Sequence, residues 1–328
     1  MDALSEILRV IKLDSAIYLN GEFSEPWGVT SPHSRILAPI LSQRPGHVII
    51  YHLLCEGTEY VELHDGTRIS LVPGDLITFP HGDRHTLGAG SCITLVDVEQ
   101  VLLPILANGL ELIRVGGGGG CSRFICGFLV CDPQLSDGFL GGLPPFIRTT
   151  IRNDESGLWL ENTLRFSVAQ AASRDPAAGA MLARLAEVLF AETLRRYGRD
   201  LPGDQTGWLA GARDPEIGKA LALLHRKPSR AWTLAELARE TGMSRTVLAE
   251  RFRHFLGEPP MTYLKRWRLR LGARALTATG HSVAQIAFDT GYESEAAFNR
   301  AFKREFGLPP ARYRKGKASS LEIAALPA

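Results

Sequence analysis

Hydrophobic and polar positions change their spacing along the chain, and each change indicates a different kind of element. From Asp2 to Leu13, apolar residues recur at intervals of three and four, which predicts an amphipathic helix. We expect this helix to pack against the strands that follow it. From Ala16 onward, short apolar runs alternate with turn residues, as in Asp65-Gly66 and Pro73-Gly74. The predicted strands cover residues 36–41, 47–55, 59–63, 68–71, 76–79 and 93–96. Six strands at this spacing favour an antiparallel sandwich or jelly-roll barrel.

Helical spacing returns in the middle of the chain. Residues 158–172 and 177–197 carry apolar faces that are wide enough to require burial. The periodicity is then lost over 198–211, where Pro202 and Gly203 indicate an interdomain linker. Trp208 is a candidate anchor for this linker.

The last third of the chain contains one helix-turn-helix pattern twice. Thr233, Leu237 and Gly242 are matched 49 residues later by Ser282, Ile286 and Gly291. After one extra residue in the second turn, the offset becomes 50 and holds through both second helices. Such an offset, kept through helices and their ends, indicates an internal repeat.

The ends of these helices have clear capping signals. Thr233 and Ser282 each precede Glu or Gln by three residues, which predicts two capping boxes. Gly242 and Gly291 are suited to end the first helices, and Ser244 and Ser294 to cap the second ones. A short helix, a turn with glycine and a longer helix form the helix-turn-helix motif, whose second helix enters the DNA major groove. A connecting helix over 259–279 would span roughly 30 Å, close to one turn of DNA.

Spacing alone would also suit an ordinary pair of helical hairpins, but the charge distribution favours nucleic acid. Residues 212–317 contain 21 Lys and Arg against 10 Asp and Glu, whereas residues 1–211 contain 16 against 24. Positive charge gathered in one helical segment is typical of a protein that binds phosphate backbones. The solvent-facing positions predicted to contact DNA are Ser244, Arg245, Thr246, Ala249 and Glu250 in the first unit and Ser294, Glu295, Ala296, Asn299, Arg300 and Lys303 in the second. Arg300 suits guanine and Asn299 suits adenine or phosphate, while pairing of Arg300 with a surface carboxylate is the alternative.

Residues 214–315 resemble the DNA-binding domain of the AraC/XylS family of bacterial transcription regulators. The second unit carries the most specific matches, which are Ile286-Ala287, Gly291-Tyr292, Ser294, Phe298, Arg300, Phe302-Lys303, Gly307, Pro309-Pro310 and Tyr313. The resemblance implies seven helices, contacts with two successive major grooves, and a signal-sensing domain elsewhere. It further implies a homodimer held by helices in the middle of the chain, and RNA polymerase as a partner.

The strand-rich region resembles the cupin-type sensing domain found in one subgroup of that family. Its first motif has Gly46, His52, Glu59 and Gly66, and its second has Gly74, Pro80, Gly82 and His85. Leu54 stands where the first motif usually has another histidine. The expected fold is therefore an α+β multidomain chain. It has an N-terminal cupin-like β-barrel (jelly roll) with accessory helices and a C-terminal all-α domain with two helix-turn-helix units. The expected bounds are 1–200 for sensing and dimerisation, 201–213 for the linker, 214–317 for DNA binding and 318–328 for a tail.

Three polar residues of the barrel are candidate ligands. By the resemblance, His52, Glu59 and His85 would converge on one divalent metal ion, for which Zn²⁺, Fe²⁺, Ni²⁺ or Mn²⁺ are suitable. Because one histidine is missing, a metal is not required, and the same residues serve equally as hydrogen-bonding groups for an organic effector. Ordinary core or loop histidines are the third alternative.

The cysteines and the N-terminus limit other function classes. Five cysteines without zinc-finger spacing favour free thiols in a reducing compartment. Cys121, Cys126 and Cys131 lie five residues apart, but nothing basic flanks Cys126, so a redox sensor is a minor alternative. The first residues include acidic side chains and no uninterrupted apolar run, which argues against a signal peptide or a membrane span and favours the cytoplasm.

These patterns predict a sequence-specific regulator of double-stranded DNA promoters or operators that is not an enzyme. It would be a homodimer and an activator, controlled by a small-molecule effector. The alternative is a cupin metalloenzyme, an oxygenase or isomerase, with a helical appendage, against which Leu54 argues. An architectural DNA binder without an effector is a third alternative.

Overall fold

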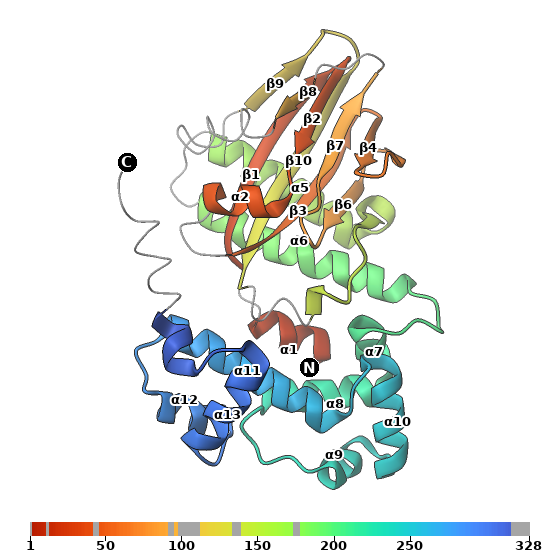
Figure 1. The fold of residues 1–328 in the computed structure, drawn as a ribbon. Coiled ribbons are helices and arrows are strands. Elements are labelled where there is room, and N and C mark those ends of the chain that lie inside the picture. The colour runs from red at the N-terminus through yellow and green to blue at the C-terminus, as the bar shows by residue number, and fades with distance from the viewer. Residues whose placement is uncertain are drawn as a thin grey trace. The chain divides into compact units, whose positions relative to one another are not determined.

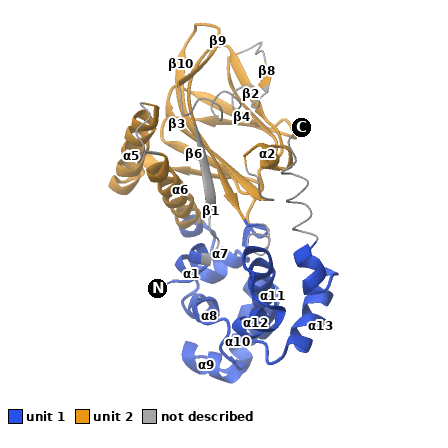
Figure 2. Cartoon of the chain, turned by 90° about the vertical axis from the view of Figure 1, so that its left-hand side faces the viewer, with its two compact units in different colours: residues 1–12, 132–142, 198–328 blue, residues 13–131, 143–197 orange. Residues whose placement is uncertain are grey.

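The chain folds into two compact units. The computed structural model describes residues 2–10, 13–41, 46–90, 95–97, 112–132, 139–172 and 178–315. One unit comprises residues 13–131 and 143–197, and the other comprises residues 1–12, 132–142 and 198–328 (Figure 1 and Figure 2). We call them the barrel unit and the helical unit.

The barrel unit is built from two antiparallel-rich sheets. The six-stranded sheet has the order β11-β6-β3-β10-β1-β9, and the five-stranded sheet has the order β5-β4-β7-β2-β8. The strands of the first sheet are β1 (Leu13–Ser24), β3 (His47–Glu56), β6 (Asp75–Phe79), β9 (Leu112–Gly116), β10 (Cys121–Cys131) and β11 (Ile147–Thr150). Those of the second are β2 (Trp27–Ser31), β4 (Glu59–Leu63), β5 (Arg68–Leu71), β7 (His85–Ala89) and β8 (Leu95–Asp97). The jelly-roll-like barrel expected from the sequence is confirmed.

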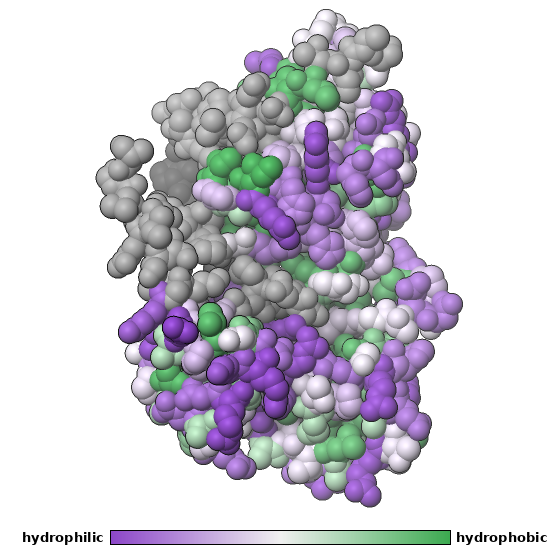
Figure 3. Space-filling view, viewed as in Figure 1, coloured by the Kyte–Doolittle hydropathy of each residue, from purple (hydrophilic) through white to green (hydrophobic). Residues whose placement is uncertain are grey.

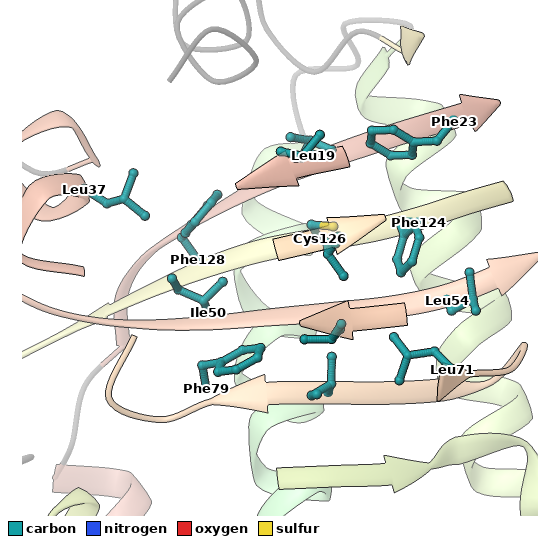
Figure 4. Packing of buried hydrophobic residues seen from close by; sticks show 14 of the residues in the cluster. Leu19, Phe23, Leu37, Ile50, Leu54, Leu71, Phe79, Phe124, Cys126 and Phe128 are labelled. Atoms are coloured by element: carbon teal, nitrogen blue, oxygen red, sulfur yellow. The ribbon is translucent and has the colours of Figure 1, made fainter. Parts of the chain in front are cut away.

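Large apolar side chains from both sheets fill the barrel interior (Figure 4). The ring of Phe23 stacks on Trp27 at 4.2 Å between centroids, and Phe124 meets Trp27 edge-on at 5.9 Å. Leu54, which replaces the usual second histidine of the cupin motif, is fully buried in this cluster. That position therefore contributes to packing and cannot supply a ligand.

The predicted strands at 47–55, 59–63, 68–71 and 76–79 correspond to β3, β4, β5 and β6. The prediction for 36–41 is wrong, because this segment forms helix α2 (Ser34–Leu41). Leu37 and Leu41, four residues apart, face the core while Ile36 is exposed, which is a helical pattern in a run too short to distinguish from a strand. The prediction for 93–96 falls partly outside the described residues, which include β8 from Leu95.

Two long helices complete the barrel unit. Helices α5 (Glu155–Ala172) and α6 (Ala178–Asp200) confirm the predicted helical segments, and the 3-10 turn η1 (Ile151–Asn153) precedes them. Arg196 of α6 is 2% exposed and lies 2.6 Å from carboxylate oxygens of both Asp154 and Glu192. Arg152 of η1 and the buried Glu161 of α5 form a second ion pair. Because both guanidinium groups have carboxylate partners, these helices carry buried charge without leaving it unpaired.

The helical unit contains the C-terminal helices. They are α7 (Trp208–Arg213), α8 (Pro215–Arg226), α9 (Leu234–Thr241), α10 (Arg245–Leu256), α11 (Pro260–Ala278), α12 (Val283–Asp289) and α13 (Glu295–Phe306). A further helical stretch begins at Pro310. Part of the predicted linker thus forms a helix, since α7 occupies residues 208–213. The predicted tail, 318–328, lies outside the described residues.

The N-terminal helix α1 (Ala3–Val10) confirms the predicted amphipathic helix but not its expected partner. It lies against α8 and α7 and clusters with the helical unit, not with the strands that follow it in sequence. Its buried residues Ala3 and Ile7 are four apart and so share one face. Among the described helices, none has the length and hydrophobicity that a membrane-spanning segment needs.

Candidate nucleic-acid interface

The first helix-turn-helix unit has the local chemistry that its sequence predicts. Thr233 accepts a hydrogen bond from the Glu236 backbone N–H at 3.1 Å, and the Glu236 carboxylate accepts one from the Thr233 backbone N–H at 3.0 Å. This capping box starts α9, and Gly242, at φ 75°, ends it. The hydroxyl of Ser244 then caps α10 by accepting from Val247 N–H at 3.2 Å. Only glycine adopts the left-handed backbone of such a tight turn at little cost.

The second helix-turn-helix unit repeats this arrangement, although the C-cap of α12 is Thr290 and not glycine. Ser282 caps α12 by accepting from Gln285 N–H, and Ser294 caps α13 by accepting from Ala297 N–H at 3.2 Å. The predicted second capping box is incomplete, because the Gln285 amide donates to Asp289 at 2.7 Å instead. An i, i+4 partner on the same helix face competes for this side chain, and sequence spacing does not resolve that competition.

The second helix of each unit, α10 or α13, presents its predicted contact residues to solvent. We call these two the reading helices. Nearly all of the predicted positions are exposed: Ser244, Arg245, Thr246 and Glu250 on the first unit and Ser294, Glu295, Ala296, Arg300 and Lys303 on the second. Ala249 and Asn299 are half-buried, and the Asn299 amide donates weakly to Glu295 at 3.5 Å. Figure 3 shows hydrophilic side chains over much of the visible face of the helical unit, in keeping with its excess of Lys and Arg.

Helix α11 connects the two helix-turn-helix units and packs closely against the second one. With 19 residues it spans about 28 Å, slightly less than the advance of one DNA turn. Gly272 permits the close approach of α13, since a Cβ atom there would lie 2.8 Å from the ring of Phe298. The core of the second unit is formed by Leu269, Ala273, Leu276, Ile286, Ala287, Phe298, Ala301 and Phe302.

Arg268 on α11 holds the first helix-turn-helix unit to the second. Its guanidinium donates to the backbone carbonyls of Pro228 at 2.7 Å, Arg230 at 2.7 Å and Gly291 at 3.0 Å. The first two carbonyls lie in the α8–α9 connection, and the third lies in the turn before α13. Burial lowers the pKa of Arg268, yet the three carbonyl acceptors satisfy its donors. In sequence, Arg268 is one of several basic residues of the connecting helix, and no signal there indicates this bridging role.

The start of α8 is held to the first reading helix. Asp214 caps α8 by accepting from Ile217 N–H at 3.0 Å, as the Asp-Pro-Glu sequence predicts. Its second carboxylate oxygen pairs with Arg251 of α10, which also lies 3.1 Å from Glu216. Arg251 is therefore engaged in the scaffold, whereas Arg245 at the start of the same helix is exposed.

A buried polar network joins α7, α8 and α11. The Trp208 indole N–H donates to the Tyr263 hydroxyl at 2.8 Å, and that hydroxyl lies 2.7 Å from His225 Nε2. The tyrosine hydroxyl thus lies within hydrogen-bonding distance of both the Trp208 indole and His225 Nε2. Burial lowers the pKa of His225 to about 3, so the ring is neutral. Trp208 does anchor the linker, while no sequence signal identified its partners.

In the barrel unit, two of the predicted ligands do meet. His52 Nε2 and His85 Nε2 lie 2.7 Å apart, and His85 Nδ1 donates to the Asp83 carbonyl at 2.7 Å. His85 Nε2 is therefore the acceptor and His52 Nε2 the donor. Burial lowers the pKa of His85 to about 4 and that of His52 well below its ordinary value, where His85 contributes further. The pair is neutral and links β3 of one sheet to β7 of the other.

Glu59 lies elsewhere in the barrel. Leu63 pairs with His85 across β4 and β7, and Glu59 is four residues away along β4, roughly 13 Å. Glu59 is 5% exposed, and its Oε2 has no hydrogen-bond partner. The pKa of Glu59 is raised to about 7, chiefly by burial and also by the Glu25 charge, while the nearby polar groups of Ser122 and Trp27 act in the opposite direction.

The three predicted ligands do not fit a divalent metal. His52 and His85 are hydrogen-bonded to each other, Glu59 is distant, and Leu54 offers no donor atom. Throughout the described ranges, no group of three or more His, Cys, Asp or Glu side chains is placed to hold a metal ion. A cupin metal centre would need at least one more nitrogen or oxygen ligand at the histidine pair.

The cysteines of β10 have the properties of core thiols. Cys126 and Cys131 are buried, and burial raises the pKa of Cys126. Cys121 is exposed at the start of the strand. A thiol with a raised pKa is a poor nucleophile, so Cys126 lacks the thiolate character of a redox sensor.

Comparisons with known proteins agree with this architecture. The cupin family matches residues 2–198, and a helix-turn-helix domain family matches residues 237–316. A putative AraC-like transcription regulator of Streptomyces antibioticus is 42% identical over 318 residues, covering 96% of this chain and 99% of that protein. The transcriptional regulator AlkR of Acinetobacter baylyi is 30% identical over 319 residues, covering 96% and 99%. A putative AraC-like regulator of Streptomyces lividans is 32% identical over 320 residues, covering 96% and 98%.

These relatives span nearly the whole chain and are transcription regulators, which disfavours the enzyme alternative. Two capped helix-turn-helix units with exposed reading helices follow a cupin barrel in one chain. The chain therefore belongs to the AraC family of helix-turn-helix transcription regulators, in the group with an N-terminal cupin domain.

Proposed function

We propose that the protein binds a specific double-stranded promoter or operator through both reading helices and activates transcription there. The observation that carries this proposal is the pair of exposed, serine-capped helices α10 and α13 joined by α11 and the Arg268 contacts. A scaffold whose length approaches one DNA turn suits two successive major grooves on one side of a duplex. Arg300 and Asn299 are the proposed base contacts, and Lys303 is a proposed phosphate contact.

Salt-dependent binding tests this proposal. Fluorescence anisotropy with the DNA that flanks its own gene should give specific binding that weakens steeply with salt, because each neutralised phosphate releases counterions. A shuffled duplex of the same composition is the control. Equal affinity for both duplexes would contradict sequence-specific binding.

A homodimer is the second part of the proposal, and exposed apolar side chains on the barrel unit support it. On α5, Trp159 is 62% and Phe166 is 58% exposed, and on α6 Val188 is 45% exposed. Trp159 and Phe166 are seven residues apart and so share one helix face. Analytical ultracentrifugation should give a dimer for the wild type and a monomer for Trp159→Arg. A wild-type monomer at micromolar concentration would contradict the dimer.

The effector is proposed to bind inside the barrel unit. Glu59 Oε2, Trp27 Nε1 and His52 Nδ1 are buried without hydrogen-bond partners. Unpaired buried polar atoms cost about 1–3 kcal/mol each, a cost that a polar effector would offset by pairing with them. Glu59 and His52 are thus proposed effector contacts, with Trp27 added by the structure, while His85, both of whose ring nitrogens already have partners, is proposed to act by holding His52.

Thermal unfolding of the full chain with a panel of small polar metabolites tests the effector site. A true effector should raise the midpoint of the wild type and not that of Glu59→Gln. A compound that stabilises both proteins equally does not use Glu59.

The same proposal includes RNA polymerase as a partner and a cytoplasmic location, because activation takes place on promoter DNA.

A further inference from the structure

Two segments that precede the C-terminal helices in sequence belong to the helical unit. Helix α1 and residues 139–142 cluster with residues 198–328, although both adjoin strands of the barrel in sequence. Phe139 and Leu140 are 1% and 2% exposed, and Ile7 of α1 is 1% exposed. Side chains so fully buried contribute to the packing of the unit in which they lie.

Phe139 contacts the network that leads to the first reading helix. Its ring meets Trp208 edge-on at 4.9 Å, and the Trp208 indole donates to Tyr263. The Tyr263 ring in turn packs edge-on against Phe252 of α10 at 5.5 Å. Phe252 is fully buried on the inner side of the helix whose outer side carries Arg245 and Thr246.

Further contacts join α1 and α7 to the same unit. Glu6 of α1 is 4% exposed, and its carboxylate lies 3.6 Å from Arg226 at the end of α8. The Gly207 backbone N–H, just before α7, donates to the Phe255 carbonyl of α10 at 2.8 Å. A Cβ atom at Gly211 would lie 3.0 Å from Leu256, so α7 and the end of α10 are in close contact.

The second helix-turn-helix unit has a separate core. Its buried cluster is drawn from α11, α12 and α13, with Tyr313 packed against it. The elements on which α1 packs are α8 and α7, which flank the first reading helix. The two helix-turn-helix units thus differ in what supports them.

Chain connectivity joins both supporting segments to one strand pair of the barrel. Helix α1 precedes β1 in sequence, and β10, which ends at Cys131, precedes the second segment. Strands β1 and β10 are antiparallel neighbours, and Leu13 at the start of β1 pairs with Cys131 at the end of β10. Both segments are therefore continuous in sequence with the same strand pair.

We propose that Phe139 and helix α1 are positioning elements for the first helix-turn-helix unit, so that the barrel acts on the DNA contacts of α10 more strongly than on those of α13, whose helix packs on a separate core. This inference rests on the proposed binding of DNA by both units. The contacts that position α10 run through Phe139, Trp208 and Tyr263, and none of these residues lies on a reading helix. A barrel signal would weaken or strengthen one half of the DNA site.

Hydroxyl-radical footprinting of the full chain, with the duplex used for affinity measurements, tests the inference. For each half-site, the affinity is taken from the protein concentration that gives half-maximal protection. Phe139→Ala and Tyr263→Phe should lower the affinity for the half-site read by α10 by ~5- to 30-fold, with protection by α13 retained. The half-site read by α13 is identified by the protection lost in Arg300→Ala. Tyr263→Phe keeps the ring against Phe252 but leaves Trp208 Nε1 and His225 Nε2 without a partner.

The salt dependence and a matched variant separate positioning from general destabilisation. In Phe139→Ala, the slope of log affinity against log salt should fall by roughly half, because it counts the phosphates still neutralised. Phe288→Ala removes an equal ring that is 74% exposed and should leave both half-sites unchanged. Equal loss over both half-sites, or no loss, in Phe139→Ala overturns the inference. A wild type without any footprint would instead overturn the proposed function.

Discussion

Replacing Arg300 with Ala should remove a base contact without harming the fold. Arg300 is exposed near the start of α13, and its pairing with a surface carboxylate, the alternative interpretation, has no counterpart in the described part of the chain. Nothing in the described residues of the helical unit therefore depends on its guanidinium. A bidentate contact of Arg with guanine is worth about 1–3 kcal/mol, so affinity for the cognate duplex should fall by ~5- to 150-fold.

The proposed base contact of Arg300 can be isolated with modified DNA. Replacing the contacted guanine with 7-deazaguanine removes the N7 acceptor and should weaken the wild type, while Arg300→Ala should be insensitive to it. Anisotropy titrations at constant salt with both proteins and both duplexes form a double-mutant cycle. A coupling energy near zero, or a loss below twofold on the cognate duplex, would refute the assignment of Arg300.

Lys303 provides the matched control on the same helix. It is exposed about one helical turn after Arg300 and carries the same charge, but it lacks the planar guanidinium group that makes bidentate contacts. Lys303→Ala should weaken binding to all duplexes alike and lower the salt slope by about one. Thermal unfolding of both variants should match that of the wild type.

Three further changes test the scaffold and the barrel. Arg268→Ala should lower the free energy of unfolding by about 2 kcal/mol in urea titrations, since three carbonyls lose charged donors, and an unchanged midpoint would contradict the bridging role. Gly272→Ala should cost about 1–3 kcal/mol by pushing on the buried Phe298 ring, with loss of α13 protection in footprints, whereas intact protection would contradict this packing. Burial raises the pKa of the Glu59 carboxyl from 4.5 to about 7, because the buried site favours the protonated form. The stability that this protonated carboxyl contributes to the fold is fully present below about pH 4.5 and is lost as pH rises through about 7. Glu59→Gln should therefore be more stable than the wild type near pH 8 and equal to it near pH 4 by thermal unfolding, and a constant difference at both pH values would contradict the raised pKa.

Much of the helical unit could be predicted because its signals are local. Caps such as Ser244 and Ser294, and the glycine that ends α9, act within a few residues and are visible in sequence. The repeat added a second, independent copy of each signal. The Gln285 side chain departed from prediction because Asp289 offers a partner on the same helix face.

The features that sequence could not provide depend on contacts between distant segments. Arg268 bonds to carbonyls 40, 38 and 23 residues away, and backbone acceptors leave no trace in residue identity. The placement of α1 with α8 was missed for the same reason, since an amphipathic face indicates burial but not its partner. In the barrel, motif spacing brought His52 to His85 correctly but placed Glu59 with them wrongly, because strand register puts Glu59 far along β4.

The central claim is that the two reading helices bind successive major grooves of one DNA duplex. Hydroxyl-radical cleavage of an end-labelled promoter fragment bound by the wild-type chain measures this directly. We expect two protected patches per protomer, about 10 base pairs apart and on one side of the helix. A single patch, or two patches on opposite sides of the duplex, would contradict the account.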